Sequence, residues 1–148
     1  MFPFRFTWGK RRRVQPTAEM LIPIEALARF IATGDEMGLE EAFATRDVVI
    51  VENFVPFVFT GPDAFARWRQ GFRDHVDRDG LSELAWRFGE AQDFADEGGT
   101  AYFVLPTTWT GRTHGRPLSE DGGWAFVLDG DQGRWRIRSY AWAVTAKR

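Results

Sequence analysis

The sequence has no cysteine, and only two histidines and two tyrosines among its 148 residues. The lack of cysteine excludes disulfide bonds, thiolate catalysis and cysteine-based metal sites, and it fits a reducing compartment. The histidines, His75 and His114, lie far apart among scattered acidic residues, so they form no metal-ligand motif. We therefore expect neither a metal ion nor a bound cofactor. Both histidines are expected to be exposed, His75 near a helix end and His114 in a turn.

Long hydrophobic runs and a strong charge of either sign are also lacking. No apolar segment approaches the roughly 20 residues that a membrane-spanning helix needs. The first residues, "MFPFRFTWGKRRR", place apolar side chains before positive ones, the reverse of a secretory signal. The net charge is -2 with acids and bases interspersed, which argues against nucleic acid or an acidic membrane as the main partner. These absences predict a soluble, cytoplasmic protein.

What the sequence does contain is a large apolar and aromatic fraction. Apolar residues make up 44% of the chain and aromatic residues 16%, which is typical of a globular domain with an aromatic interior. The length suits one domain. We expect an N-terminal extension over residues 1–19, whose Phe2, Phe4 and Trp8 pack on a neighbouring surface, and a single domain over residues 20–148. The seven tryptophans favour a cavity lined by flat, rigid rings.

Apolar spacing predicts three helices in the first half of the chain. The first covers residues 22–33, with Pro23 in its first turn and Gly34 after its end. A short second helix, capped by Asp35, is expected to lead into a strand over residues 47–53, where β-branched residues take over. The third helix begins at "GPDAF" and places four apolar side chains on one face: Phe65, Trp68, Phe72 and Val76.

Beyond Gly80 the apolar residues alternate with a period of two, which predicts strands. Turn-forming clusters separate four such strands: "DEGG" at 96–99, "GRTHGRP" at 111–117 and "DGDQG" at 129–133. Helices followed by hairpin-linked strands indicate an α+β domain, with the helices packed on a bent antiparallel sheet. Pro106 lies inside one strand and cannot donate a ladder hydrogen bond, so it marks a bulge or a locally unpaired edge.

The order of these elements resembles the NTF2-like superfamily. The similarity covers roughly residues 23–145 and includes the segments "GDEMGLEEAF", "DVVIVENF", "GPDAF" and "GRWRIRSYAWAV". Within the superfamily, the chain is most similar to SnoaL-like and ketosteroid-isomerase-like proteins. The resemblance implies a cone with an apolar pocket, made by three N-terminal helices and a strongly bent antiparallel sheet. It also implies a homodimer that forms through the sheet.

The resemblance further implies where isomerase chemistry would lie, and the expected catalytic groups are absent there. Asn53 stands at the position of the base, Leu27 at that of a tyrosine and Trp124, approximately, at that of a second aspartate. An amide cannot take up the proton, leucine offers no donor, and indole donates one bond but does not titrate. A register one residue earlier would place Glu52 at the base position. Strand alternation lets only one of Glu52 and Asn53 face the pocket.

Four polar side chains are candidates for the chemistry of the site. Asn53 either anchors a ligand carbonyl or hydroxyl, or ends a strand by bonding loop backbone. An inward Glu52 would have a raised pKa and serve as a base near neutral pH, whereas an outward Glu52 would pair with arginine. Arg138 and Tyr140 are expected on one face of the last strand. They suit either an anionic or hydroxylated ligand or a dimer interface, and Tyr140 joins Glu52 as a catalytic candidate.

The pocket implied by the resemblance would be lined by aromatic and apolar residues from several elements. The same residues are equally well explained as plain core. The residues predicted to bind a ligand are Asn53, Phe57, Trp68, Phe103, Leu105, Trp109, Trp124, Phe126, Arg138, Tyr140 and Trp142.

Three functions remain open at this point. The first is binding of a small apolar, cyclic or aromatic ligand without catalysis. The second is a SnoaL-like enzyme that isomerises, cyclises, hydrates or dehydrates such a ligand with general acid and base groups. The third is an accessory domain whose sheet binds another protein chain. An open cavity with Glu52 pointing inward beside Tyr140 would favour catalysis, an inward Asn53 would favour binding, and a filled interior would favour the accessory domain.

Overall fold

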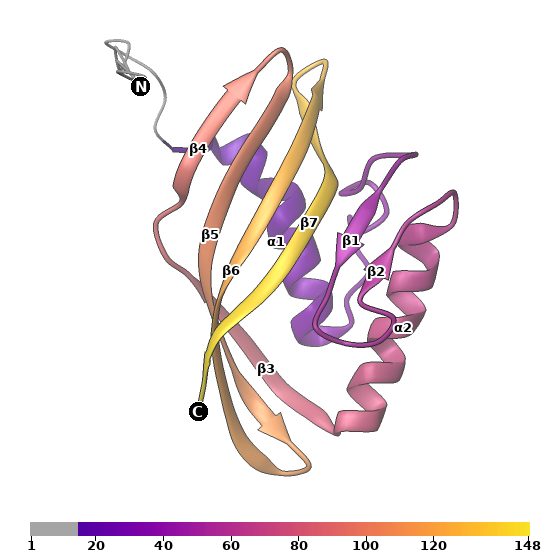
Figure 1. The fold of residues 1–148 in the computed structure, drawn as a ribbon, viewed down its shortest axis with the longest axis vertical. Helices are drawn as coiled ribbons and strands as arrows, with labels where there is room; N and C mark the ends of the chain where they lie inside the picture. The colour runs from indigo at the N-terminus through magenta and orange to yellow at the C-terminus, as the bar shows by residue number, and fades with distance from the viewer. Residues whose placement is uncertain (1–14) are drawn as a thin grey trace, which may run out of the picture.

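The structure is a computed structural model that describes residues 15–148, so the packing expected of Phe2, Phe4 and Trp8 lies outside the described residues. Two helices, α1 (Ala18–Thr33) and α2 (Ala64–Asp79), lie against a seven-stranded bent sheet (Figure 1). The predicted α+β class is confirmed. The strands are β1 (Val49–Val51), β2 (Val58–Phe59), β3 (Leu81–Phe88), β4 (Gln92–Glu97), β5 (Thr100–Thr113), β6 (Arg116–Asp131) and β7 (Arg134–Lys147).

Helix α1 begins earlier than Pro23 suggested. The hydroxyl of Thr17 accepts a hydrogen bond from the backbone N–H of Met20, so the N-cap lies at Thr17. The helix ends as predicted at Gly34, whose φ of 77° is the left-handed conformation that glycine adopts without strain. Its inner face buries an apolar stripe of Met20, Ile24, Leu27 and Phe30.

The second predicted helix is wrong. Residues 36–43 form a series of short turns instead, in which the N–H of Ala42 donates to the carbonyls of both Gly38 and Leu39. Gly38 has a φ of 74°, which interrupts a right-handed helix. Phe43 then pairs with Ile137 of β7. The apolar spacing was real, since Leu39, Ala42 and Phe43 are buried, but turns achieve this burial.

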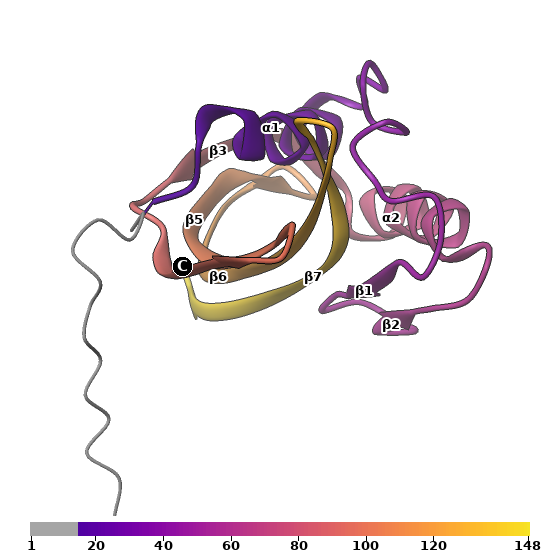
Figure 2. The ribbon, with the colours of Figure 1, turned by 90° about the horizontal axis from the view of Figure 1, so that it is seen from above.

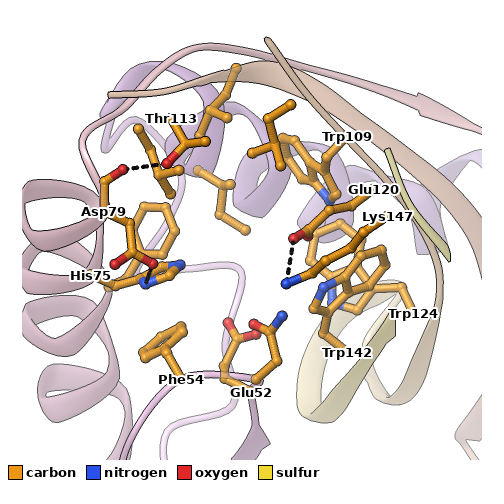
Figure 3. A pocket seen from close by; sticks show the side chains of 16 residues that line it. Glu52, Phe54, His75, Asp79, Trp109, Thr113, Glu120, Trp124, Trp142 and Lys147 are labelled. Carbon is orange, nitrogen blue, oxygen red and sulfur yellow. Dashed lines mark hydrogen bonds and ion pairs between the residues drawn. The ribbon is translucent and has the colours of Figure 1, made fainter. Parts of the chain in front are cut away.

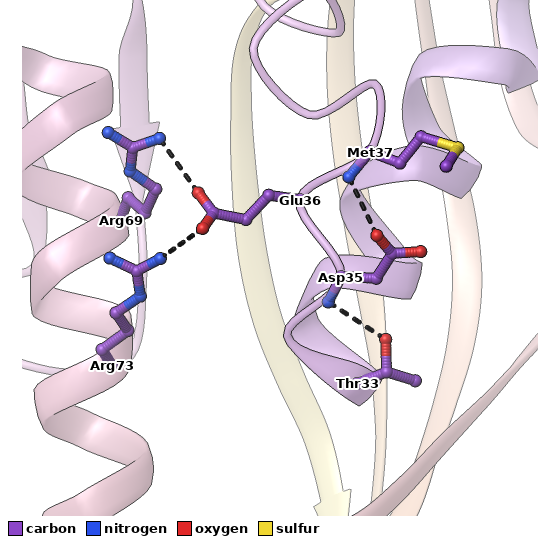
Figure 4. Close-up of polar contacts among 6 residues, drawn as sticks. All are labelled: Thr33, Asp35, Glu36, Met37, Arg69 and Arg73. Carbon is purple, nitrogen blue, oxygen red and sulfur yellow. Dashed lines mark hydrogen bonds and ion pairs between the residues drawn. The ribbon is translucent and has the colours of Figure 1, made fainter.

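Polar contacts tie this turn segment to both helices (Figure 4). The backbone N–H of Met37 donates to Asp35, and that of Asp35 to the hydroxyl of Thr33. Glu36 reaches across to α2, where its two oxygens accept hydrogen bonds from Arg69 at 3.1 Å and Arg73 at 2.8 Å. These groups are exposed, so each pair contributes at most about 1 kcal/mol.

The predicted third helix is confirmed as α2. It ends at Gly80, and its inner face buries Trp68 and Phe72. Beside it lies the short β1–β2 hairpin, whose β1 pairs in parallel with β7 (Figure 1). The strand predicted over residues 47–53 is therefore shorter than expected and ends at Val51.

The rest of the sheet contains five strands after Gly80, rather than the four predicted. The order is β2-β1-β7-β6-β5-β3, and β4 also pairs with β5. The extra break falls at residues 89–91. Before it, β3 pairs with residues 107–113 of β5, and after it, β4 pairs with residues 100–104 of the same strand. Pro106 lies opposite this break, so its missing N–H falls where neither β3 nor β4 is paired with it.

The sheet curls strongly around its own interior. Seen from above, β5, β6 and β7 curve into a partial barrel that α1 closes on one side, with α2 and the β1–β2 hairpin beside it (Figure 2). Two adjacent glycines of β6, Gly122 and Gly123, pair with Thr107 and Pro106 in the bend. The inward residues of β5 and β6 form the core: Ala101, Phe103, Leu105, Thr107, Trp124, Phe126 and Leu128.

A bulge in β7 overturns the predicted face of the last strand. Leu128 pairs with Ile137 and Val127 with Ser139, so Arg138 is an extra residue in the ladder. The bulge resets the alternation: Ile137 and Tyr140 both point inward, although three positions apart, and Arg138 is exposed. Arg138 and Tyr140 therefore do not share a face.

The close packing around Gly122 gives a testable consequence. A Cβ added at Gly122 would lie 2.5 Å from the carbonyl oxygen of Ala143 and 2.5 Å from the indole of Trp142. We expect Gly122→Ala to lower the free energy of unfolding by about 1–3 kcal/mol through overpacking, measured by urea denaturation. Gly123→Ala is the matched control, because its nearest neighbour would be Val104 at 3.4 Å. Equal stability of the two variants would contradict the packing described.

Candidate functional site

A cavity of about 290 Å³ lies between α2, the β1–β2 hairpin and the inner surface of the sheet (Figure 3). The interior is therefore not filled by the protein's own side chains. Apolar side chains make most of its wall, and polar groups enter it at a few points. The apolar lining includes Ile31, Phe54, Phe72, Leu81, Leu84 and Leu118.

Glu52 directly follows β1, and its side chain points into this cavity (Figure 3). Its backbone N–H donates to the carbonyl of Phe57 at 2.8 Å, which fixes the turn out of the strand. Its side chain is buried, with the residue only 8% exposed. One carboxyl oxygen, Oε2, accepts two hydrogen bonds, from Trp68 Nε1 at 2.8 Å and from the Tyr140 hydroxyl at 2.6 Å. Three elements, β1, α2 and β7, thus meet at one carboxyl group.

The environment of Glu52 makes it titrate near neutrality. Burial raises the pKa of Glu52 from 4.5 to about 7, while the hydrogen bonds from Tyr140 and Trp68 lower it and the charge of Glu120 raises it further. Burial, and then the charge of Glu52, raise the pKa of Tyr140 well above 10, so the phenol remains a donor. Within residues 15–148, no hydrogen bond engages the second oxygen of Glu52, Oε1. That oxygen is free to exchange a proton with a molecule in the cavity.

The α2 side of the cavity carries His75 and Asp79. His75 Nδ1 lies 3.1 Å from Asp79 Oδ2 but has no hydrogen-bond partner in the part of the chain described. The imidazole stacks on Phe54, with ring centroids 4.6 Å apart and planes 12° apart. Burial lowers the pKa of His75 despite the opposing charge of Asp79. At neutral pH this side chain is therefore an uncharged imidazole.

The opposite side of the cavity carries Glu120 and Lys147 (Figure 3). The Lys147 ammonium lies 3.5 Å from a Glu120 carboxylate oxygen. The Glu120 side chain is only 17% exposed, whereas that of Lys147 is 63% exposed. The pair therefore places a largely shielded carboxylate inside the cavity and its counter-ion at the solvent.

Three tryptophans from successive strands, Trp109, Trp124 and Trp142, form an indole wall. The Trp124 ring centroid lies 6.1 Å from each of the other two, with interplanar angles of 65° to Trp109 and 76° to Trp142. Neighbouring rings in the wall therefore meet edge to face rather than stacked. The excess of tryptophan noted in the sequence thus contributes to a cavity.

The predicted site residues fall into distinct groups. Asn53, Trp109, Trp124 and Trp142 line the cavity together with Glu52. Trp68 and Tyr140 lie behind Glu52, fully buried, as its donors. The others do not reach the cavity: Phe103, Leu105 and Phe126 are core, Phe57 is 53% exposed, and Arg138 is exposed beside Asp129.

The structure distinguishes between the alternatives left open for the pair after β1. Glu52 is not an outward carboxylate paired with arginine, because it is buried and bonded to Trp68 and Tyr140. Burial alternates through the end of β1, with Ile50 and Glu52 buried and Asn53 exposed, so Glu52 takes the inward position and Asn53 lines the cavity only from its exposed edge.

Sequence reasoning missed the four other ionisable groups of the site: His75, Asp79, Glu120 and Lys147. His75 was expected to be exposed, but its side chain is 18% exposed and faces the cavity. Helical spacing could have found two of these residues, since 68, 72, 75 and 79 follow one face of α2. Glu120 and Lys147 depend on the long β6–β7 pairing, which local patterns do not reveal.

No group of three or more acidic, histidine or cysteine residues in residues 15–148 is arranged to hold a metal ion. No helix in this described part is long and apolar enough to span a membrane.

Comparison with known proteins identifies the fold. No family model and no curated protein matches the chain. Among solved structures, a protein from Kribbella flavida is 11% identical over 88% of this chain and 91% of its own, with a TM-score of 0.72. An NTF2-like superfamily protein from Salmonella enterica is 13% identical over 84% of this chain and 87% of its own, with a TM-score of 0.67. A hexachlorocyclohexane dehydrochlorinase is 8% identical over 85% of this chain and 82% of its own, with a TM-score of 0.66. The predicted NTF2-like fold is confirmed.

The burial of Glu52 predicts a dependence of stability on pH. Because its folded pKa is about 7 and its unfolded pKa 4.5, the folded state holds the proton more tightly, and stability falls as pH rises from 4.5 through 7. The full penalty, about 3 kcal/mol, is present above that range. In Glu52→Gln the amide oxygen still accepts from Trp68 and Tyr140 but cannot ionise. We expect this variant to match the wild type near pH 4 and to exceed its stability by about 3 kcal/mol at pH 8.

Urea denaturation of both proteins from pH 4 to pH 8 measures this difference. Titration of His75 and the other groups occurs in both proteins and cancels in the comparison. A stability difference that does not change with pH would contradict a raised pKa at Glu52.

Proposed function

We propose that this protein, with its NTF2-like fold, binds a small apolar, cyclic or aromatic molecule in the cavity and moves a proton on it, with Glu52 as the base. One observation carries the proposal: a buried carboxyl group whose pKa is about 7 leaves one oxygen free toward an apolar cavity. A general base acts best when its pKa is near the working pH. Such a group costs folding stability, and proteins keep costly buried groups mainly at functional sites.

The contacts of Glu52 suit proton abstraction from carbon. Oε1 would take the proton while Trp68 and Tyr140 hold Oε2, so the carboxyl group keeps one orientation in both charge states. The uncharged imidazole of His75, on another part of the same wall, is a second group that can accept or return a proton. Two proton-transfer groups around one ligand suit isomerisation, elimination or dehydration.

The size and walls of the cavity support a ring-containing ligand. A volume of about 290 Å³ admits one or two rings, and the indole wall offers flat surfaces for stacking. The similar fold of hexachlorocyclohexane dehydrochlorinase, an enzyme named for a dehydrochlorination, supports elimination on a ring as one such reaction.

The arrangement differs from the isomerase pattern that the resemblance implied. Leu27, at the expected tyrosine position, is fully buried and does not line the cavity. The phenol comes instead from Tyr140 on β7 and bonds the carboxyl group of Glu52 rather than pointing at the cavity by itself. Steroid isomerisation through the usual pair of oxyanion donors is therefore not what these residues favour.

The outer face of the sheet supports the proposal that two copies associate through it. The centre of that face carries no charged residue, and each residue of this centre is at least partly exposed. Three registered rows form it: Tyr102, Val127 and Ser139; Val104, Ala125 and Ala141; and Pro106, Gly123 and Ala143. A contiguous uncharged surface of this kind is typical of an interface.

The base can be tested without knowing the natural substrate. 5-Nitrobenzisoxazole is a two-ring C–H acid: a base takes its carbon-bound proton, the ring N–O bond breaks, and a coloured phenolate with a nitrile forms. We expect the wild type to catalyse this opening with a rate that rises to a plateau above a midpoint near pH 7, because the carboxylate is the active form. Glu52→Gln should lower the rate at pH 8 by about 100-fold or more.

Tyr140→Phe separates the base from its positioning donor. Loss of the phenol removes a bond that favours the charged carboxylate, so the midpoint should move above 7 while the plateau persists. Equal rates in the wild type and Glu52→Gln would rule out proton transfer by this residue and leave binding without catalysis as the function.

Dimerisation has its own test. Ala125→Arg places a charge in the centre of the outer face, so we expect it to convert a dimer to a monomer in sedimentation velocity. Thr110→Arg, on an exposed position of β5 away from those rows, is the matched control and should remain dimeric. A wild-type protein that sediments as a monomer at micromolar concentration would contradict the proposed association.

A further inference from the structure

The charged groups around the cavity are unbalanced. Three carboxyl side chains line it, Glu52, Asp79 and Glu120, and Lys147 is its one cationic lining residue within residues 15–148. His75 adds no charge at neutral pH, because burial lowers its pKa. Figure 3 shows Asp79 and Glu120 on opposite sides of the space, with Glu52 between them. A molecule in the cavity is thus surrounded by acidic groups.

The counter-ions of the outer two carboxylates lie toward solvent. Lys147 is 63% exposed and its ammonium is 3.5 Å from Glu120. Arg78, 57% exposed, is 3.7 Å from one oxygen of Asp79, and the other oxygen faces the imidazole of His75. Ion pairs at such distances whose cation is exposed are weak, because water solvates the cation and its long side chain loses entropy in the pair. Both carboxylates are therefore able to accept a stronger partner.

The charges of these carboxylates shift the pKa of both Glu52 and His75. The charge of Glu120 raises the pKa of Glu52. The charges of Asp79 and Glu120 also raise the pKa of His75, and each outweighs the lowering by its own counter-ion, Arg78 or Lys147. The carboxylates thus favour the more positive state of a group in the cavity. The potential inside the cavity is thus negative, which attracts a cation and repels an anion.

The indole wall adds a surface that also favours a cation. Trp109, Trp124 and Trp142 line the cavity, and the π face of an indole attracts positive charge more strongly than that of the other aromatic side chains. The combination of indole faces with carboxylates at their margin provides both an apolar surface and a counter-charge. A flat apolar body alone would need the indoles but not Glu120 and Asp79.

We propose that the ligand of this cavity carries a positively charged amine on an apolar ring system. The ammonium group would lie against the indole wall between Asp79 and Glu120, displacing Lys147, and the ring would extend toward Glu52 and the apolar lining. This inference rests on the proposed function only in that the cavity binds a ligand. It extends that proposal by naming the charge of the ligand.

Three indole compounds that differ at one group test the charge directly. Tryptamine is a cation at pH 7.5, tryptophol is neutral, and indole-3-acetate is an anion, and all three are of similar size. Isothermal titration calorimetry at low salt should give a dissociation constant for tryptamine about 10-fold or more below that of tryptophol, with indole-3-acetate weakest. Added salt should weaken the binding of tryptamine and leave the binding of tryptophol unchanged.

Two variants identify the groups responsible. Glu120→Gln should weaken the binding of tryptamine by about 5-fold or more without changing the affinity for tryptophol. Lys147→Gln should strengthen the binding of tryptamine, because it frees Glu120 from its ion pair. Circular dichroism and the unchanged tryptophol affinity show that each variant is folded.

The outcomes are separable from those of the proposed reaction. Preference for indole-3-acetate, equal affinity for the three compounds, or no binding of any at about 1 mM would overturn the inference. Selective binding of tryptamine, together with equal opening of 5-nitrobenzisoxazole by the wild type and Glu52→Gln, would uphold the charge of the ligand and reject the base. Catalysis that depends on Glu52 together with preference for the anion would reject only the charge.

Discussion

The carboxyl group of Glu52 and its two donors hold the functional part of this molecule together. The bonds from Trp68 and Tyr140 join α2 and β7 to the end of β1, three elements that are far apart in the sequence. Burial at this junction keeps the group protonated up to about neutral pH, and its second oxygen faces an apolar space. The same feature that weakens the fold at high pH is the one on which the proposed base depends, because its pKa lies near the pH where proteins usually work.

The surrounding fold provides this geometry through departures from regular structure. Ile50 of β1 pairs in parallel with Tyr140 of β7. This register brings the inward side chain of Tyr140 beside Glu52, two residues after Ile50. The bulge at Arg138 turns Tyr140 inward, and Glu52 continues the inward alternation of Ile50 beyond the end of β1. Without the bulge, the last strand would direct Arg138 to the same face as Tyr140.

Local patterns predicted the fold class, most elements and part of the site. The "GPDAF" start, the period of two beyond Gly80 and the three turns were visible in the sequence because each depends on neighbouring residues. The failed second helix shows the limit, since spacing alone cannot show that Gly38 has a positive φ. The orientation of Glu52 and the entry of Glu120 into the cavity depend on pairing between distant strands, which no local pattern encodes.

The central claim is that the folded protein holds a glutamate that titrates near neutrality. Carbon-13 NMR of protein labelled at the glutamate side-chain carboxyl measures this directly, because each chemical shift follows the ionisation of its own group. The resonance that disappears in Glu52→Gln should titrate with a midpoint near pH 7. A midpoint near 4.5 for that resonance, the ordinary value for glutamate, would contradict the account.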